Sequence, residues 1–290
     1  MATLDQRMES FDSYLMMKNF SFQTRTSYLR TLREFDNFRR ENGIRGRYGQ
    51  LQAKSYLLAR IKSGKSWSTI NGDYSALRKY FREVANLAWS LKKVPRPRKE
   101  DRLPEILSKE DVQKIIEHAV NYKHQVFLTF VYATGLRLSE SLNVKLDDID
   151  GNRRQIRVSK GKGSKDRYIT IPECLLDLLR NYWRKHRPEN YLFNGKRLGS
   201  RFSNRAAQWS MIRAKERAKM TKPASIHTLR HCYATHHIES GTDLVYLQEQ
   251  LGHKHLRTTA RYVHLCMEEC VRQINHPISS MQIRYRETDR

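Results

Sequence analysis

The chain has 290 residues, of which 39% are hydrophobic, so it is long enough to form two domains that each bury a core. It carries 55 lysines and arginines against 30 aspartates and glutamates, and the resulting net charge of +25 is typical of proteins that bind a polyanion. The sequence lacks an apolar run of about 18 residues, which excludes a membrane span, and no separate basic amphipathic helix favours a membrane surface.

The basic excess is spread over the whole chain. Residues 1–98 hold 20 basic and 8 acidic side chains, a balance of +12, and the remaining residues hold 35 and 22, a balance of +13. Both parts are therefore suited to contact phosphate. The four cysteines form no C-x-x-C pair and are expected to be reduced thiols. Residues 1–10 are polar and charged, so we expect no signal peptide and a cytoplasmic protein.

The first part of the chain, residues 1–91, is predicted to be an all-helical domain, because apolar residues recur at helical spacing. Ser21 and Ser66 are candidate N-caps, and Gly43 is expected to end a helix. The predicted helices span residues 4–18, 21–40, 50–63 and 67–86. Basic side chains on their polar faces suit contacts to a phosphate backbone. The candidates are Arg25, Arg30, Lys65, Arg78 and Lys79.

Residues 92–103 are predicted to be an extended linker. Pro95 and Pro97 stand there among basic residues, and the segment has no hydrophobic period. A linker of this composition can follow a phosphate backbone, so Arg96 and Arg98 are added to the candidate DNA contacts.

Residues 104–276 are predicted to form a second domain of helices with one β-hairpin. A helix begins after Ser108, an apolar helix ends at Gly135, and another begins at Leu138, which puts Arg137 at a junction between helices. Residues 153–159 and 167–171 alternate apolar and polar side chains around a glycine-rich turn, which is typical of a hairpin.

Further helices are predicted after the hairpin. They span residues 174–186, 203–220, 226–240, 243–251, 258–262 and 267–274. The segment 258–262 carries Tyr262, and residues 277–290 are expected to be a tail. The fold class is therefore mainly α with a small antiparallel β-hairpin or sheet.

Four motifs stand in a fixed order in the second domain. The first reads ATGLRLSE (133–140), and the second is GKG (161–163) in the hairpin turn. The third, HTLR, begins 90 residues after the arginine of the first motif. The fourth is LGH (251–253), followed nine residues later by a tyrosine. These motifs supply Arg137, Lys162, His227, Arg230, His253 and Tyr262.

The order and spacing of these motifs resemble those of the tyrosine recombinase (phage integrase) family. The resemblance covers most of residues 1–275 and implies a helical core-binding (SAM-like) domain that grips DNA, followed by an α+β catalytic domain. It implies that Tyr262 is the nucleophile, that Arg137 and Arg230 clamp the scissile phosphate, and that His253 donates a hydrogen bond to it. His227 is expected to act as the base.

Two further roles follow from the resemblance. A lysine on the hairpin turn protonates the leaving 5′ oxygen, and Lys162 matches it, with Lys160 and Lys165 in the same turn as rivals and candidate DNA contacts. Glu140 is expected to orient the arginines. The chemistry is physically reasonable, because two guanidiniums stabilise charge on the non-bridging oxygens of the transition state.

The implied reaction forms a 3′-phosphotyrosyl bond and stores the energy of the cleaved link, so religation needs neither ATP nor a metal. No cofactor is expected, and the histidine spacing, without a cysteine pair, does not favour a zinc site. The partner is double-stranded DNA with specific recombination sites. Four protomers are expected to assemble on it, as a homo-tetramer or as a hetero-tetramer with a paralogue.

Several functions remain open at this stage. The leading interpretation is the integrase of a mobile element, and the alternative within the family is a Xer-like resolvase of chromosome or plasmid dimers. A type IB topoisomerase shares the catalytic residue types, although the GLRLSE stretch and the separate helical domain argue against it. A DNA-binding protein without activity is disfavoured because every expected catalytic position is filled.

Overall fold

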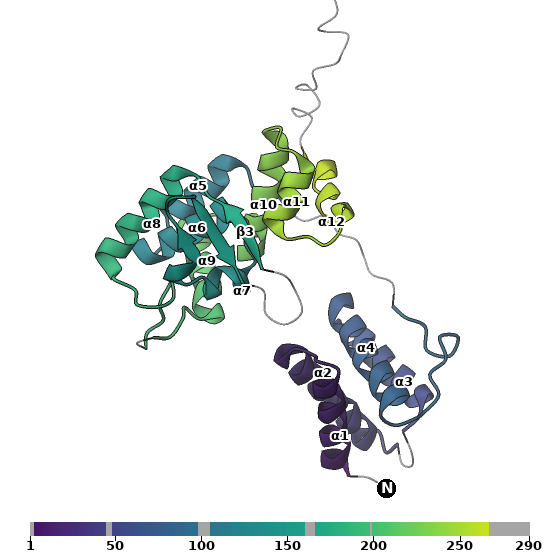
Figure 1. Ribbon diagram of the computed structural model, residues 1–290. Coiled ribbons are helices and arrows are strands. Elements are labelled where there is room, and N and C mark those ends of the chain that lie inside the picture. The colour runs from purple at the N-terminus through teal and green to yellow at the C-terminus, as the bar shows by residue number, and fades with distance from the viewer. Residues whose placement is uncertain (1–2, 45–47, 98–104, 160–165, 198, 267–290) are drawn as a thin grey trace, which may run out of the picture. The chain divides into compact units, whose positions relative to one another are not determined.

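The computed structural model describes residues 3–44, 48–97, 105–159, 166–197 and 199–266. The chain divides into two compact units, Met1–Arg102 and Leu103–Arg290, whose elements Figure 1 shows. Most of the described residues are helical, and one small sheet lies in the second unit, as the sequence predicted. In the described part of the chain, no helix has the length and apolar character that a membrane crossing requires.

The first unit contains the four helices expected from the sequence. They are α1 (Leu4–Met17), α2 (Phe22–Glu41), α3 (Gln50–Lys62) and α4 (Trp67–Glu83). The predicted caps at Ser21 and Ser66 are confirmed, because each side chain accepts a hydrogen bond from the backbone N–H three residues later. Phe11, Phe35 and Tyr74 are fully buried in the aromatic core that joins the helices.

The segment predicted as a linker differs from the expectation at its beginning. Helix α4 ends at Glu83, and the chain then folds back on the same unit, where Val94 is 1% exposed. The hydroxyl of Tyr74 donates to the carbonyl of Val94 at 3.4 Å, and Nε of Arg96 donates to Asn71 at 3.2 Å. Residues 92–97 therefore pack on the first unit because one apolar side chain fills its core, and they are not an extended connection.

The second unit is a helical body around a small sheet. Its elements are α5 (Lys109–Glu117), α6 (Tyr122–Thr134), α7 (Leu138–Asn143), η1 (Leu146–Asp148), β1 (Ile149–Asp150), β2 (Gln155–Val158), β3 (Arg167–Thr170), α8 (Glu173–His186), α9 (Asn204–Arg217), α10 (Ile226–Glu239), α11 (Leu244–Leu251), α12 (Leu256–Ala260) and η2 (Val263–Leu265).

The hairpin predicted from the alternating strands is confirmed. Strands β2 and β3 pair antiparallel, with Ile156 opposite Ile169, and both side chains are fully buried. Strand β1 extends the sheet on the other side of β2 in the order β1-β2-β3. It has only two residues, too few for a periodic signal, so the sequence analysis missed it.

Helix α6 forms the centre of the second unit, and α10 packs against it. The side chains of Val126, Phe127, Leu128, Phe130 and Val131 are fully buried. A helix that is apolar on all sides must be covered on all sides, and Figure 1 shows α5, α8, α9 and α10 around it. Gly135 ends α6 in the left-handed conformation, as expected.

Two expectations at the C-terminal end have different outcomes. Helix α12 begins earlier than predicted and ends at Ala260, so Tyr262 lies in the turn between α12 and η2 rather than on a helix. The helix predicted over residues 267–274 and the tail lie outside the described residues.

Candidate active site

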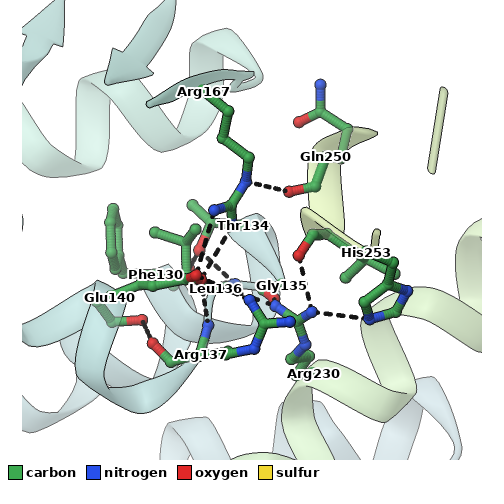
Figure 2. A network of polar contacts seen from close by, with 12 residues as sticks. Phe130, Thr134, Gly135, Leu136, Arg137, Glu140, Arg167, Arg230, Gln250 and His253 are labelled. Carbon is green, nitrogen blue, oxygen red and sulfur yellow. Dashed lines mark hydrogen bonds and ion pairs between the residues drawn. The ribbon is translucent and has the colours of Figure 1, made fainter. Parts of the chain in front are cut away.

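A largely enclosed carboxylate, that of Glu140, lies at the centre of the predicted site, with 11% of its side chain exposed. Arg137 is the N-cap of α7, so the carboxylate accepts hydrogen bonds from its backbone N–H at 3.0 Å and from its Nη1 at 2.9 Å. Both Nη atoms of Arg167 donate to the same carboxylate, at 3.2 and 2.9 Å. Nη1 of Arg230 lies 3.9 Å from it. Figure 2 shows three guanidiniums around one carboxylate.

Arg230, on α10, is the most enclosed of the three arginines, with 2% of its surface exposed. Its Nη1 donates to the carbonyl of Gly135 at 2.6 Å, and its Nη2 donates to the carbonyl of Leu251 at 2.8 Å. Those carbonyls stand at the ends of α6 and α11, where no intrahelical partner is available. Burial lowers the pKa of Arg230 to about 10, so the guanidinium keeps its charge at pH 7.

Arg137 differs from Arg230 in its exposure. The side chain of Arg137 is 41% exposed, whereas that of Arg230 is 2% exposed and that of Arg167 is 11% exposed. Burial alone would raise the pKa of Glu140, but the hydrogen bonds and charge of Arg167, with those of Arg137, outweigh burial and lower that pKa to about 2. The carboxylate is therefore ionised at pH 7 and holds Arg137 at the open side of the cluster.

His253 links the arginines to the segment that carries the tyrosine. Its Nε2 lies 3.0 Å from Nη2 of Arg230, and its Nδ1 lies 2.9 Å from the hydroxyl of Thr259 in α12. The ring of Tyr262 lies nearly parallel to that of His253, with centroids 6.4 Å apart. The turn after α11 thus places His253 against the buried guanidinium, and the turn after α12 places the ring of Tyr262 against His253.

The hydroxyl of Tyr262 is paired with a histidine that the sequence analysis did not select. Nδ1 of His231 lies 2.9 Å from that hydroxyl, and Tyr262 is only 7% exposed. His227, which was expected to assist the phenol, is exposed and packs edge-on against His231, with ring centroids 4.5 Å apart. The contact expected of His227 is therefore made by His231, one helical turn further along α10.

The protonation states of this group follow from burial and charge. Burial raises the pKa of Tyr262 above its ordinary value of 10.0, although Arg230 opposes the shift. Burial, with the charges of His227 and Arg230, lowers the pKa of His231 to about 4, and burial with Arg230 does the same for His253. At pH 7 the phenol keeps its proton, and both imidazoles are neutral.

Two glycines let the backbone approach the arginines. Gly135 has φ +60° and its carbonyl holds Arg230, while a Cβ at this position would overlap the ring of Tyr233. Gly252 has φ +64°, and a Cβ there would lie 2.7 Å from Cζ of Arg167. Both positions require a left-handed residue without a side chain, which explains the glycines in the first and fourth motifs.

Substituting Gly135 by alanine is expected to destabilise the second unit by about 2–5 kcal/mol, because a left-handed alanine and an overpacked side chain add together. Gly241→Ala is the matched control, since Gly241 also has a positive φ but open space around it, and should lose only about 1–2 kcal/mol. Urea unfolding of both variants measures the difference. Equal losses would contradict the packing argument.

Comparison with known proteins identifies the family. The phage integrase family matches residues 105–269, and the phage integrase N-terminal SAM-like domain matches residues 8–86. The chain is 37% identical to a putative integrase/recombinase y4qK of Sinorhizobium fredii, over 91% of this chain and 85% of that protein. It is 32% identical to the tyrosine recombinase XerA of Pyrococcus horikoshii, over 88% and 87%.

The chain belongs to the phage integrase family. The fold agrees with this assignment. A crystal structure of the XerH site-specific recombinase bound to a palindromic difH substrate has a TM-score of 0.73 at 20% identity, over 93% of this chain and 84% of that one. A crystal structure of a lambda integrase dimer bound to a core site has a TM-score of 0.72 at 17% identity, over 89% and 97%.

The structure of this phage integrase family member describes the surroundings of some residues predicted to contact DNA, and others lie outside its described residues. Arg25 is held by Asp12 through two hydrogen bonds of 2.7 and 2.6 Å, so it supports the packing of α1 against α2 and is not an open cation. Arg30 and Lys65 are exposed. Arg96 is also exposed, although its Nε donates to Asn71. Arg78 and Lys79 are half-buried, and the ammonium of Lys79 lies over the ring of Phe20.

Four predicted residues fall outside the described part of the chain. They are Arg98, Lys160, Lys162 and Lys165. In the described residues, no three His, Cys, Asp or Glu side chains come together as a metal site would need.

Two residues of this site escaped the sequence analysis. His231 had a usable signal, because it lies four residues after His227 and so on the same face of α10. Arg167 had none, since nothing in a basic hairpin distinguishes one strand arginine from its neighbours.

Proposed function

We propose that this chain is a site-specific recombinase that cleaves and rejoins double-stranded DNA through a 3′-phosphotyrosyl link to Tyr262. The observation that carries the proposal is the arrangement around the phenol. Arg230 and His253 are in contact with each other, Arg137 and Arg230 lie at the same carboxylate, and the ring of Tyr262 packs against His253. This group therefore combines a nucleophile with two cations, Arg137 and Arg230, that can stabilise the charge on a phosphodiester under attack.

In the proposed cleavage step, the phenolic oxygen attacks phosphorus, and the bond from phosphorus to the 5′ oxygen breaks. Arg137 and Arg230 stabilise the charge that builds on the non-bridging oxygens. In the present arrangement Nε2 of His253 accepts from Nη2 of Arg230, because a guanidinium only donates, so the neutral ring carries its proton on Nδ1. We propose that with DNA bound the ring takes the other tautomer, in which Nδ1 accepts from the hydroxyl of Thr259 and Nε2–H donates to the phosphate.

The proton of the phenol is proposed to pass to His231. A general base must lie within about 2.6–3.2 Å of the proton donor, and the 2.9 Å contact meets that condition. The low pKa of His231 reflects burial and nearby cations, and a bound phosphate offsets those cations by its own charge. His227, exposed at the beginning of α10, is then available to the phosphate.

The leaving 5′ oxygen needs a proton, which we assign to Lys162 on the hairpin turn. Rejoining reverses both transfers and uses the energy kept in the phosphotyrosyl bond, so we propose a reaction without metal or ATP. We further propose that four protomers assemble on two DNA sites in the cytoplasm, and that the enzyme integrates and excises a mobile element. The similarity to XerA keeps dimer resolution as the second biological role.

An assay on supercoiled DNA with two candidate sites tests the proposal. Recombinant circles are the expected product, and a covalent protein–DNA adduct should accumulate when one strand carries a nick. Relaxation without exchange would assign the chain to topoisomerase chemistry instead. Binding without an adduct would remove the proposed activity.

His231→Gln is expected to slow formation of the adduct by about 10²–10⁴-fold, the usual contribution of a general base, and to leave DNA affinity nearly unchanged. The amide can keep a hydrogen bond to Tyr262 but cannot take its proton. Single-turnover cleavage of a nicked substrate measures the rate, with His227→Gln as the companion variant. A larger loss in His227→Gln would return the role of base to His227.

A further inference from the structure

The side chain of Arg167 is fully engaged inside the protein. It is the first residue of β3, and its side chain is 11% exposed. Nη1 and Nη2 donate to the two oxygens of Glu140, and Nε donates to the carbonyl of Gln250 at 3.2 Å. Every nitrogen of the guanidinium therefore has a protein acceptor, so the side chain is held by the protein on all three nitrogens.

These contacts join three separate elements. Glu140 stands in the first turn of α7, and Gln250 stands in the last turn of α11. A second link between β3 and α11 lies beside the first, because the backbone N–H of Thr170 donates to the side chain of Gln250 at 3.2 Å. The guanidinium also approaches the backbone of Gly252 closely. Figure 2 shows Arg167 between Glu140 and Gln250.

Each residue that Arg167 contacts either holds a proposed phosphate ligand or is close to one in the sequence. Glu140 holds Arg137 by a backbone and a side-chain hydrogen bond. Leu251, between Gln250 and Gly252, holds Nη2 of Arg230 through its carbonyl, and His253 follows directly. The position of one strand arginine therefore affects the positions of Arg137, Arg230 and His253.

The charges favour the same arrangement. Glu140 faces three guanidiniums, and Arg167 occupies both of its oxygens in a bidentate pair, which is the strongest geometry for such a bond. The carboxylate is thereby held away from Arg230, whose Nη1 stays 3.9 Å distant. Among the described contacts, Arg137 gives Glu140 only its backbone N–H and Nη1, which leaves the rest of its guanidinium for a phosphate.

We propose that Arg167 is a positioning residue for strand cleavage, which holds Glu140 and the end of α11 so that Arg137 and Arg230 meet the same phosphate. The inference rests on the proposed function. A lysine cannot replace Arg167, because an ammonium is a point donor that cannot span Glu140 and Gln250 together.

The experiment measures the cleavage rate constant at saturating protein on a nicked substrate, together with DNA affinity and the melting temperature, for Arg167→Lys and Arg167→Gln. Both variants are expected to cleave about 10²-fold more slowly, the effect of misplacing catalytic groups by about 1 Å, while affinity changes by less than about threefold. Arg157→Gln is the matched control, because Arg157 stands on the neighbouring strand β2, pairs with Asp148 at the end of η1 and should keep the wild-type rate.

A double variant separates positioning from general stability. If Arg167 acts through Glu140, Arg167→Gln combined with Glu140→Gln should be about as slow as the slower single variant, since residues that act as a unit are not additive. Independent losses that multiply would contradict that route.

The remaining outcomes are also decisive. A folded Arg167→Lys protein that cleaves at the wild-type rate overturns the role of Arg167 even if Arg167→Gln fails to fold. A loss of melting temperature without a loss of rate, measured well below that temperature, makes Arg167 structural. If the wild type itself forms no adduct, the proposed function fails, and this inference fails with it.

Discussion

Tyr262→Phe is expected to eliminate the covalent protein–DNA adduct and all recombinant product. The substitution removes one oxygen atom, which is the proposed nucleophile, and no other group can form the phosphotyrosyl bond. Loss of a catalytic nucleophile costs about 10⁶-fold in other covalent enzymes, so the residual rate should be undetectable. A nicked duplex that releases its short 5′ fragment after cleavage traps the adduct, and a denaturing gel then measures it.

Folding and DNA binding should survive this substitution. The ring of Tyr262 packs in a small apolar cluster with Tyr233, Leu247 and Leu251, and phenylalanine keeps that packing. The lost hydrogen bond to His231 is worth about 1 kcal/mol. Tyr233→Phe is the matched control, since it removes a phenolic hydroxyl from the same cluster and should still form the adduct. An adduct that persists in Tyr262→Phe would place the nucleophile at another residue.

Arg230→Lys is expected to reduce the cleavage rate by about 10³-fold or more, because the variant loses a transition-state cation of fixed geometry and also shifts His253. The stability of the second unit should fall as well. The carbonyls of Gly135 and Leu251 are buried beside the guanidinium, and each carbonyl left unpaired costs about 1–3 kcal/mol.

Single-turnover cleavage and urea unfolding together separate the two effects of Arg230→Lys. Arg213→Lys serves as the control, because Arg213 is an exposed α9 residue paired with Glu216, and it should change neither quantity measurably. If Arg230→Lys were unstable but cleaved normally while folded, Arg230 would be a structural residue and the proposed clamp would lose one of its two cations.

The sequence was sufficient for most of the fold, because its signals were local. Caps such as Ser21 and Ser66, the glycine after α6 and the alternating strands each specify a short segment without reference to the rest of the chain. Val94 shows the limit of that reasoning. It stands among prolines and basic residues, and only the cavity left by the four helices determines that it is buried.

The residues of the candidate site also divide into those that a local sequence signal identified and those that only the fold identifies. The spacing of its motifs was enough to select Arg137, Arg230, His253 and Tyr262, and the structure brings the first three together beside the phenol. The choice between His227 and His231 was not available from spacing, because both face the same way on α10. The turn after α12 decides it, by bringing the hydroxyl of Tyr262 to His231.

The burial of Tyr262 affects how this protein should behave on DNA of unrelated sequence. A charge of +25 draws the chain to phosphate regardless of base sequence, so most encounters are with the wrong stretch of a genome. A phenol that is enclosed and still protonated is inert during such encounters. Under the proposed function, we therefore expect discrimination between targets to follow attachment, because an almost fully buried hydroxyl must gain access to the phosphate before it can attack.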